Sequence, residues 1–200
     1  MKKLLLVSVV VLFAVSINAQ VQFGIKAGMN IASQKLTAGG ISISPKSLIG
    51  FHAGVILDMA MGETFAIQPG FLFSQKGAKY DSDGETGTDT YNYLDIPINV
   101  VYKINTGSAK ILLNVGPLFS YALSEKSEGS EDATFGSGDG ELKRLDFGIG
   151  FGGGVQFGSV VASLNYNLGL ANIMNVPSGA DVSLKNNVFG ISIAYFFGGK

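Results

Sequence analysis

The sequence predicts an all-β fold: an eight-stranded antiparallel up-and-down β-barrel that crosses a membrane and follows an N-terminal signal peptide. Large apolar residues alternate with small or polar ones along eight segments, which is the two-residue period of a strand. Tight turns alternate with long polar connections between these segments. Charged residues make up only 14% of the 200 residues, against roughly 25% in a typical soluble domain, and glycine accounts for 28 residues.

The N-terminal segment has the three parts of a secretory signal peptide. Lys2-Lys3 is its basic part, residues 4–15 are its apolar part, and residues 17–19 form an acceptable cleavage site. We therefore predict a signal peptide over residues 1–19 and a single barrel domain over residues 20–200. The alternative is an uncleaved membrane anchor, but the apolar run is shorter than the ~20 residues of a spanning helix.

Each predicted strand places large apolar side chains on one face and small or polar side chains on the other. The first begins directly after the leader, where Val21 and Phe23 alternate with Gln22 and Gly24. The complete set of predicted strands covers residues 21–31, 49–59, 65–76, 93–103, 111–121, 145–155, 162–169 and 189–197. An even number of antiparallel strands returns both chain ends to the same side of the membrane.

The connections between the strands alternate in length. The tight turns are rich in Gly, Asn and Ser and lie at residues 61–63, 105–108 and 158–159. The long polar connections lie near residues 31–47, 77–90, 124–141 and 171–185. An antiparallel meander puts all short turns at one end and all long loops at the other, as in bacterial outer-membrane barrels. We therefore expect both termini in the periplasm and four loops outside the cell.

The composition of the polar face favours a membrane barrel. A face exposed to water is usually rich in Lys and Glu, whereas this one consists mostly of Gly, Ser, Asn and Gln. Ten of the 15 acidic residues lie instead in two connections, within residues 81–89 and 125–141. Small side chains suit a narrow interior, so we expect the apolar face to contact lipid, where closure satisfies every backbone group. The alternative is a secreted lipocalin-like barrel or a sandwich.

Net charge and cysteine content exclude several classes of function. The formal net charge is −1, so the chain lacks the positive charge with which nucleic-acid binders attract phosphates, and no nucleic-acid partner is expected. The sequence contains no cysteine, which excludes disulfides, thiolate metal sites and a lipidated cysteine.

Several charged residues fall on inward-facing strand positions: Lys26, Lys76, Lys103, Arg144, Asp58, Asp95 and Asp146. Buried charges need partners, so we expect ion pairs in the interior. Lys26 and Asp58 are predicted to lie close together near the periplasmic end. A second network in the outer half is predicted to contain Asp95, Asp146, Lys76 and Arg144. We interpret this interior as a polar plug, because eight strands enclose little more than their own side chains; the alternative is a proton or ion path.

His52 is the only histidine and would be the natural general base of a hydrolase in the lumen. Ser74 or Ser120 would then be its nucleophile, but no motif supports a catalytic triad. We favour a packed lumenal histidine, and we expect no catalytic residue, no cofactor-binding residue and no cofactor.

Three further segments resemble known motifs only in part. Residues 81–85, Asp-Ser-Asp-Gly-Glu, alternate oxygen ligands, but their glycine comes too early for an EF-hand. Residues 124–141 are also acidic, and such loops could bind divalent cations that bridge lipopolysaccharide phosphates. We favour solvated acidic loops and predict no metal site. Residues 148–154 lack the lysine and helix of a phosphate loop, so we interpret their glycines as permitting tight packing in the lumen.

Six segments form a specific combination: FGIKAGMNIAS (23–33), YLDIPINVVYKI (93–104), GPLFSYAL (116–123), LDFGIGFGGGVQF (145–157), YNLGLANI (166–173) and NVFGISIAYFF (187–197). Together they resemble the PorT-type outer-membrane β-barrel family of Bacteroidetes, over nearly the whole chain after the leader. The resemblance implies an eight-stranded outer-membrane barrel and no particular activity, although the family's namesake is linked to protein secretion.

We interpret the chain as an integral outer-membrane barrel, and not an enzyme, with a structural or interaction role at the cell envelope like small OmpX-type barrels. The alternatives are an accessory factor in protein secretion or envelope biogenesis, and a lipid-modifying enzyme that uses His52. The expected partners are outer-membrane lipid and lipopolysaccharide, the barrel-assembly machinery during insertion, and an envelope or secretion protein.

Overall fold

A computed structural model describes residues 21–82, 85–128, 135–177 and 179–198, and these form one antiparallel sheet. Its strands are β1 (Val21–Ala38), β2 (Ile41–Ile43), β3 (Lys46–Met61), β4 (Phe65–Ser82), β5 (Glu85–Asn105), β6 (Lys110–Glu128), β7 (Leu145–Phe157), β8 (Val160–Gly169) and β9 (Val182–Phe197). The described ranges hold no helix long and apolar enough to cross a membrane. The predicted signal peptide, residues 1–19, lies outside the described residues.

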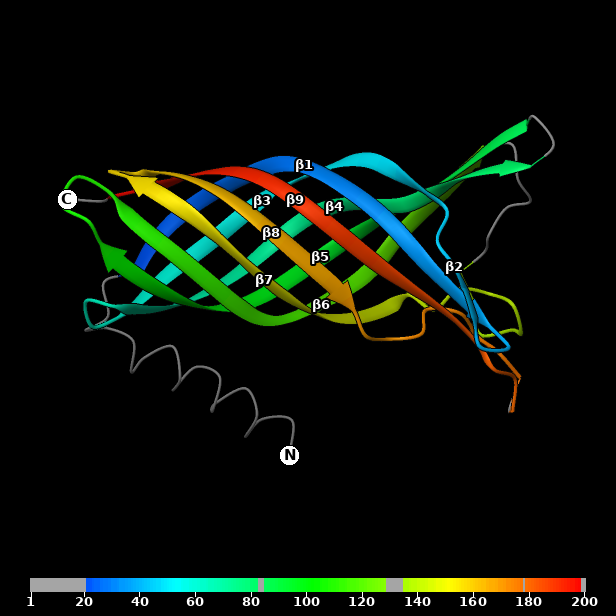
Figure 1. The fold of residues 1–200 in the computed structure, drawn as a ribbon. Coiled ribbons are helices and arrows are strands. Elements are labelled where there is room, and N and C mark those ends of the chain that lie inside the picture. Colours follow the sequence, from blue (N-terminus) through cyan, green and yellow to red (C-terminus); the bar gives the residue numbers. More distant parts are fainter. Residues whose placement is uncertain (1–20, 83–84, 129–134, 178, 199–200) are drawn as a thin grey trace.

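Eight long strands close into a ring (Figure 1), because β1 pairs with β3 along one edge and with β9 along the other. Each strand of the ring pairs antiparallel with the strands next to it. The remaining strand, β2, spans three residues and pairs with β1 in a hairpin. The predicted all-β, up-and-down, eight-stranded barrel is therefore confirmed, and its strands are those that the alternation indicates.

The two ends of the barrel differ. The tight turns and both ends of the described chain gather at one end, which we call the turn end (Figure 1). At the opposite end, called the extended end, β4 and β5 pair as far as Ser82 and Glu85, and β6 pairs with β5 as far as Glu128. The predicted long loops at residues 31–47 and 77–90 are therefore largely strand, and the predicted loop at 124–141 is strand as far as Glu128.

The large apolar side chains point away from the barrel axis. Phe71 is 55% exposed, Leu113 51% and Ile193 65%, and similar residues surround the ring. A soluble barrel packs its apolar face inside, so an exposed apolar belt excludes the lipocalin-like and sandwich alternatives. This arrangement is the one that a lipid environment favours.

Aromatic side chains gather on this belt near the turn end. The ring centroids of Phe23 and Phe197 lie 5.8 Å apart, and those of Phe65 and Tyr102 lie 5.2 Å apart. Phe157 is 61% exposed at the same end. Aromatic side chains are enriched at membrane–water interfaces, so these residues indicate where one interface crosses the barrel.

The interior is layered along the barrel axis. Near the turn end, a cluster that we call the inner apolar layer comprises Ile56, Ala66, Leu72, Val101, Leu112, Val161, Ala194 and Phe196. Near the extended end, the outer apolar layer comprises Tyr91, Tyr93, Ala122, Leu142, Ile173 and Leu184. Leu142 and Ile173 come from the connections that follow β6 and β8, which fold over the ring and insert these side chains. Polar side chains fill the space between the two layers.

Candidate functional site

A hydrogen-bonded cluster around His52 occupies the middle of the barrel. Nδ1 of His52 lies 2.8 Å from Asn30 Oδ1, and Nε2 lies 2.8 Å from Ser192 Oγ. Asn30 Nδ2 also donates to Ser74 Oγ at 3.0 Å. All four side chains are buried, so the cluster joins β1, β3, β4 and β9 across the lumen. The expectation of a packed lumenal histidine agrees with this geometry.

The serine that contacts the histidine is not one of those proposed from the sequence. Ser74 lies opposite His52 in the β3–β4 register but bonds Asn30, and Ser120 bonds Lys76. Ser192 is 140 residues from His52 along the chain, and only closure of the ring brings them together. The signal that could have found Ser192 is the alternation of β9, which directs it inward.

The hydrogen-bonded chain resembles the nucleophile, base and orienting group of a hydrolase, with Ser192, His52 and Asn30 in these three positions. The cavity beside them has a volume of about 50 Å³, which is close to that of one or two water molecules. The apolar layers lie on either side of it along the axis. A lipid substrate therefore has no room at this cluster, and the three side chains serve as a structural hydrogen-bond network.

Lys76 is the centre of a second network toward the extended end. Its Nζ lies 2.8 Å from Asp95 Oδ1 and 2.8 Å from Ser120 Oγ, and 4.5 Å from the centroid of the Tyr93 ring. Its side chain is only 2% exposed. The predicted pairing of inward lysine and aspartate is thus confirmed for Lys76 and Asp95.

Of the other two predicted members of this network, Asp146 lies beside Lys76 in the same cavity, whereas Arg144 lies outside it. Asp146 is buried and accepts a hydrogen bond of 2.9 Å from Asn186 Nδ2. The prediction that Arg144 points inward is wrong: Arg144 is exposed, donates to the carbonyl of Ala122 and places its guanidinium over Phe135. Arg144 directly precedes β7, so the strand alternation from which its direction was predicted does not apply.

The predicted pairing of Lys26 with Asp58 is also wrong. Asp58 Oδ1 lies 2.7 Å from Lys103 Nζ, and its other oxygen accepts a hydrogen bond from Gln68. In the β1–β3 register Lys26 opposes Gly54, four residues along the strand from Asp58. Lys103 comes from β5 and reaches Asp58 across the turn end. The adjacency of β1 and β3, from which the pairing was predicted, does not indicate this contact.

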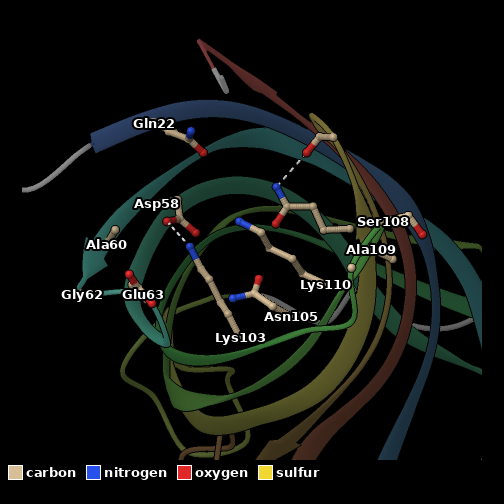
Figure 2. A pocket seen from close by; sticks show the side chains of 13 residues that line it. Gln22, Asp58, Ala60, Gly62, Glu63, Lys103, Asn105, Ser108, Ala109 and Lys110 are labelled. Atoms are coloured by element: carbon tan, nitrogen blue, oxygen red, sulfur yellow. Dashed lines mark hydrogen bonds and ion pairs between the residues drawn. The ribbon is translucent and has the colours of Figure 1, made fainter.

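The Lys103–Asp58 pair lies in a pocket that opens at the turn end (Figure 2). The pocket has a volume of about 440 Å³ and carries charges of both signs, with Glu63 and Lys110 also on its wall. Figure 2 shows the side chains of Lys103 and Lys110 extending into the opening. The inner apolar layer follows directly, since Ile56, Val101 and Leu112 lie two residues farther in on the same strands.

The acidic segments give no described metal centre. Asp81 and Glu85 belong to the β4–β5 hairpin, whereas residues 83–84 and 129–134 lie outside the described part. Lys126 and Glu128 form an exposed ion pair at the end of β6. In the described ranges, no group of three or more His, Cys, Asp or Glu side chains is arranged to hold a metal ion.

The glycines of β7 make room for polar side chains of β8. A Cβ on Gly150 would lie 2.7 Å from Asn167 Oδ1, and one on Gly152 would lie 2.5 Å from Asn165 Oδ1. Both distances are shorter than the contacts that real Cβ atoms make. The interpretation of residues 148–154 as glycines that permit tight lumenal packing is confirmed.

Comparison with known proteins gives the family. The model of a family described as the outer membrane protein beta-barrel domain matches residues 16–175. The chain belongs to this family. The outer membrane protein beta-barrel domain family and the exposed apolar belt together make the chain an integral outer-membrane barrel. No curated protein matches the chain in sequence.

Solved structures of outer-membrane proteins are similar to the chain. OprG of Pseudomonas aeruginosa is 13% identical, with a TM-score of 0.51 over 88% of this chain and 95% of OprG. Ail, the attachment invasion locus protein of Yersinia pestis, is 15% identical, with a TM-score of 0.45 over 88% of this chain and 98% of Ail. At these identities, the likeness to OprG shows the fold alone.

Proposed function

We propose that this outer-membrane barrel has a structural and interaction role at the cell envelope, exerted through the sheet that extends beyond the ring. The lengths of its strands carry this proposal. A membrane-spanning β-strand needs about 9–11 residues, whereas β5 has 21 and β6 has 19. About ten residues of each strand are thus in excess of the span, which corresponds to roughly 30 Å of extended chain.

One edge of this extension is unpaired in the described part of the chain. β6 pairs with β7 only up to Tyr121 and Leu145, whereas it pairs with β5 as far as Glu128. Beyond Tyr121, the described part of β7 no longer pairs with β6. One backbone hydrogen bond remains there, from the Ala122 amide to the Arg144 carbonyl. An unpaired strand edge offers backbone donors and acceptors to an extended segment of a partner.

We further infer that the interior is a structural plug and conducts no solutes. Three cavities of the described lumen have volumes of only about 50, 40 and 10 Å³. Porins, in contrast, leave a continuous aqueous channel. Buried ion pairs and hydrogen bonds of the lumen then serve to hold the eight strands together.

The proposal includes the orientation predicted from the sequence. The turn end faces the periplasm with both termini, and the extended end faces the exterior, because short periplasmic turns and longer external segments are usual in such barrels. Outer-membrane lipid then surrounds the apolar belt, lipopolysaccharide lies around the extended end, and barrel-assembly machinery inserts the chain. The more specific likeness to the PorT-type barrels of Bacteroidetes belongs to this proposal as well.

A role as an accessory factor in secretion or envelope biogenesis is the second candidate function. The pocket at the turn end favours it, because in this orientation a polar opening of about 440 Å³ with Lys103, Lys110 and Glu63 on its wall faces the periplasm. A lipid-modifying enzyme that uses His52 is not supported, since the cavity at His52 is too small for a lipid.

Single cysteines test the orientation and the interaction together, because the chain has no cysteine of its own. Ser124→Cys lies on the exposed part of the β6 extension, and Ser108→Cys lies in the β5–β6 turn and serves as the control. In intact cells, a membrane-impermeant maleimide should label position 124, whereas position 108 should react only after the outer membrane is permeabilised.

A thiol-reactive crosslinker should then give protein adducts at 124 that are absent at 108. Equal adducts at both positions would contradict the interaction role, and labelling of 108 alone would contradict the orientation.

A further inference from the structure

Lys26 has an unusual position among the charged side chains of the lumen. It lies on β1 between Gly54 of β3 and Ala194 of β9, neither of which offers a polar side chain. Lys26 is half-buried, and its side chain lines two small cavities of the lumen. Among the residues that the structure describes, the side chain of Lys26 forms no ion pair and no hydrogen bond.

The carboxylates of the lumen already have other partners. Asp58 is paired with Lys103, and Asp95 with Lys76. Asp146 accepts a hydrogen bond from Asn186 and lies within the electrostatic influence of Lys76. Burying a charge without a partner is costly, so the ammonium of Lys26 needs a countercharge that these side chains do not supply at contact distance.

Two adjoining cavities surround Lys26, with volumes of about 50 and 40 Å³. Both are lined by Lys26, Asn99, Asn114 and Asn165. Asn114 and Asn165 are hydrogen-bonded to each other at 3.1 Å. The side chain of Asn99, on β5, forms no hydrogen bond with any described residue, so its amide adds free N–H donors to those of the ammonium.

The balance of donors and acceptors on these walls favours an anion. An ammonium group carries three N–H donors and an asparagine amide carries two. The donors of Lys26 and Asn99 are not taken up by hydrogen bonds to described residues. Asp95 also lines the first cavity, but its carboxylate is held by Lys76. Each cavity accommodates about one or two water-sized occupants, at roughly 30 Å³ each, which a monatomic halide matches and a substituted phosphate does not.

We propose that Lys26 and Asn99 form an internal binding site for a small monovalent inorganic anion of the size of chloride or bromide. The bound anion neutralises the buried ammonium and joins β1 to β5 across the lumen. It thereby supplements the ion pair of Asp58 at the turn end and the ion pair of Asp95 beside the first cavity. This inference is independent of the proposed function, since it concerns only the interior.

Bromide is the probe that tests the site, because it can be located by its anomalous scattering. Crystals of the refolded barrel soaked in sodium bromide should show an anomalous peak within hydrogen-bond distance of Lys26 Nζ. The peak should disappear in Lys26→Met, weaken in Asn99→Leu and persist in Lys103→Met, which removes a lysine paired elsewhere. Absence of a peak at Lys26, which would indicate that only water occupies the cavities, would overturn the proposal. A peak that Lys26→Met leaves unchanged, an adventitious ion only, would also overturn it.

Unfolding in solution supplies a second measurement that does not depend on crystals. At constant ionic strength, replacing gluconate by bromide should raise the urea midpoint of the wild-type barrel, because an anion that binds only the folded state stabilises it. In Lys26→Met the midpoint should no longer differ between the two salts, and in gluconate it should equal or exceed that of the wild type, since the unpaired charge is gone. An equal bromide effect in both proteins would contradict the proposal.

Discussion

The imidazole of His52 lies directly over Gly28 of the neighbouring strand. The two residues oppose each other in the β1–β3 register, and a Cβ on Gly28 would come within 2.7 Å of His52 Cε1. Gly28 also opposes Ser192 in the β1–β9 register. Because Gly28 has no side chain, the ring of His52 crosses β1 and reaches Ser192 on the far side. Closure of the polar cluster therefore depends on a glycine that itself forms no side-chain contact.

Replacement of Gly28 should destabilise the barrel strongly. In Gly28→Ala the methyl group would meet both the His52 ring and, at 2.1 Å, the backbone carbonyl oxygen of Ile191. Overpacking of this kind typically costs about 1–3 kcal/mol, and urea unfolding of the refolded protein measures it. The matched control is Gly190→Ala, where the nearest atom lies 3.7 Å away and little change is expected. Equal losses in both variants would show that the space over Gly28 is not the cause.

Removal of the imidazole should affect stability and not catalysis. His52→Ala leaves Asn30 Oδ1 and Ser192 Oγ buried without their partner, so we expect the free energy of unfolding to fall by about 1–3 kcal/mol. Ser192→Ala, which breaks only one of the two hydrogen bonds of the ring, should cost less. Hydrolysis of lipid or lipopolysaccharide esters should be the same in all three proteins. Loss of such hydrolysis in His52→Ala, with stability unchanged, would instead support a catalytic histidine.

The outer network should show strong coupling between Lys76 and Asp95. Lys76→Met leaves the Asp95 carboxylate buried without a countercharge, and losses of about 3–5 kcal/mol are typical when one partner of a buried pair is removed. The double variant Lys76→Met/Asp95→Leu removes both charges and should lose less stability than either single variant. Unfolding free energies of the four proteins give the coupling energy directly. Additive losses would mean that the two charges act independently.

The alternation of apolar and polar residues predicted the ring well, because each spanning strand has one face in lipid and the other in a narrow lumen. It therefore fixes both the strand and the direction of residues such as Leu113 and Ser120. The same signal stops in the strand extensions, because a buried position there holds Asp89 and an exposed one holds Lys79, so apolar and polar residues no longer alternate. Pairing continues there nevertheless, as Tyr80 and Gly87 show, and this is why the extensions were predicted as loops.

The partners of lumenal side chains were harder to predict than their direction. The adjacency of β1 and β3 suggested an ion pair between Lys26 and Asp58. Instead, the tilt of the strands brings Lys103 to Asp58 across the opening. Ser192 reaches His52 only because the last strand closes on the first. Such contacts depend on register and on ring closure, which are global properties of the sheet that no local sequence pattern records.

The outward-facing apolar belt leads to a final prediction, which compares the cost of an arginine at a lipid-facing position with its cost at the rim. Val115 is 48% exposed at the middle of the part of β6 that pairs with β7, where its partners are Val100 and Phe151. An arginine on the lipid face typically costs about 2–4 kcal/mol at the bilayer midplane and about 0–1 kcal/mol near an interface. We therefore expect Val115→Arg to lower the free energy of unfolding in lipid vesicles far more than Met61→Arg, which is also exposed but lies at the turn end. Equal effects at the two depths would contradict a lipid-facing belt, because in water the cost of an exposed arginine does not depend on its height along the barrel.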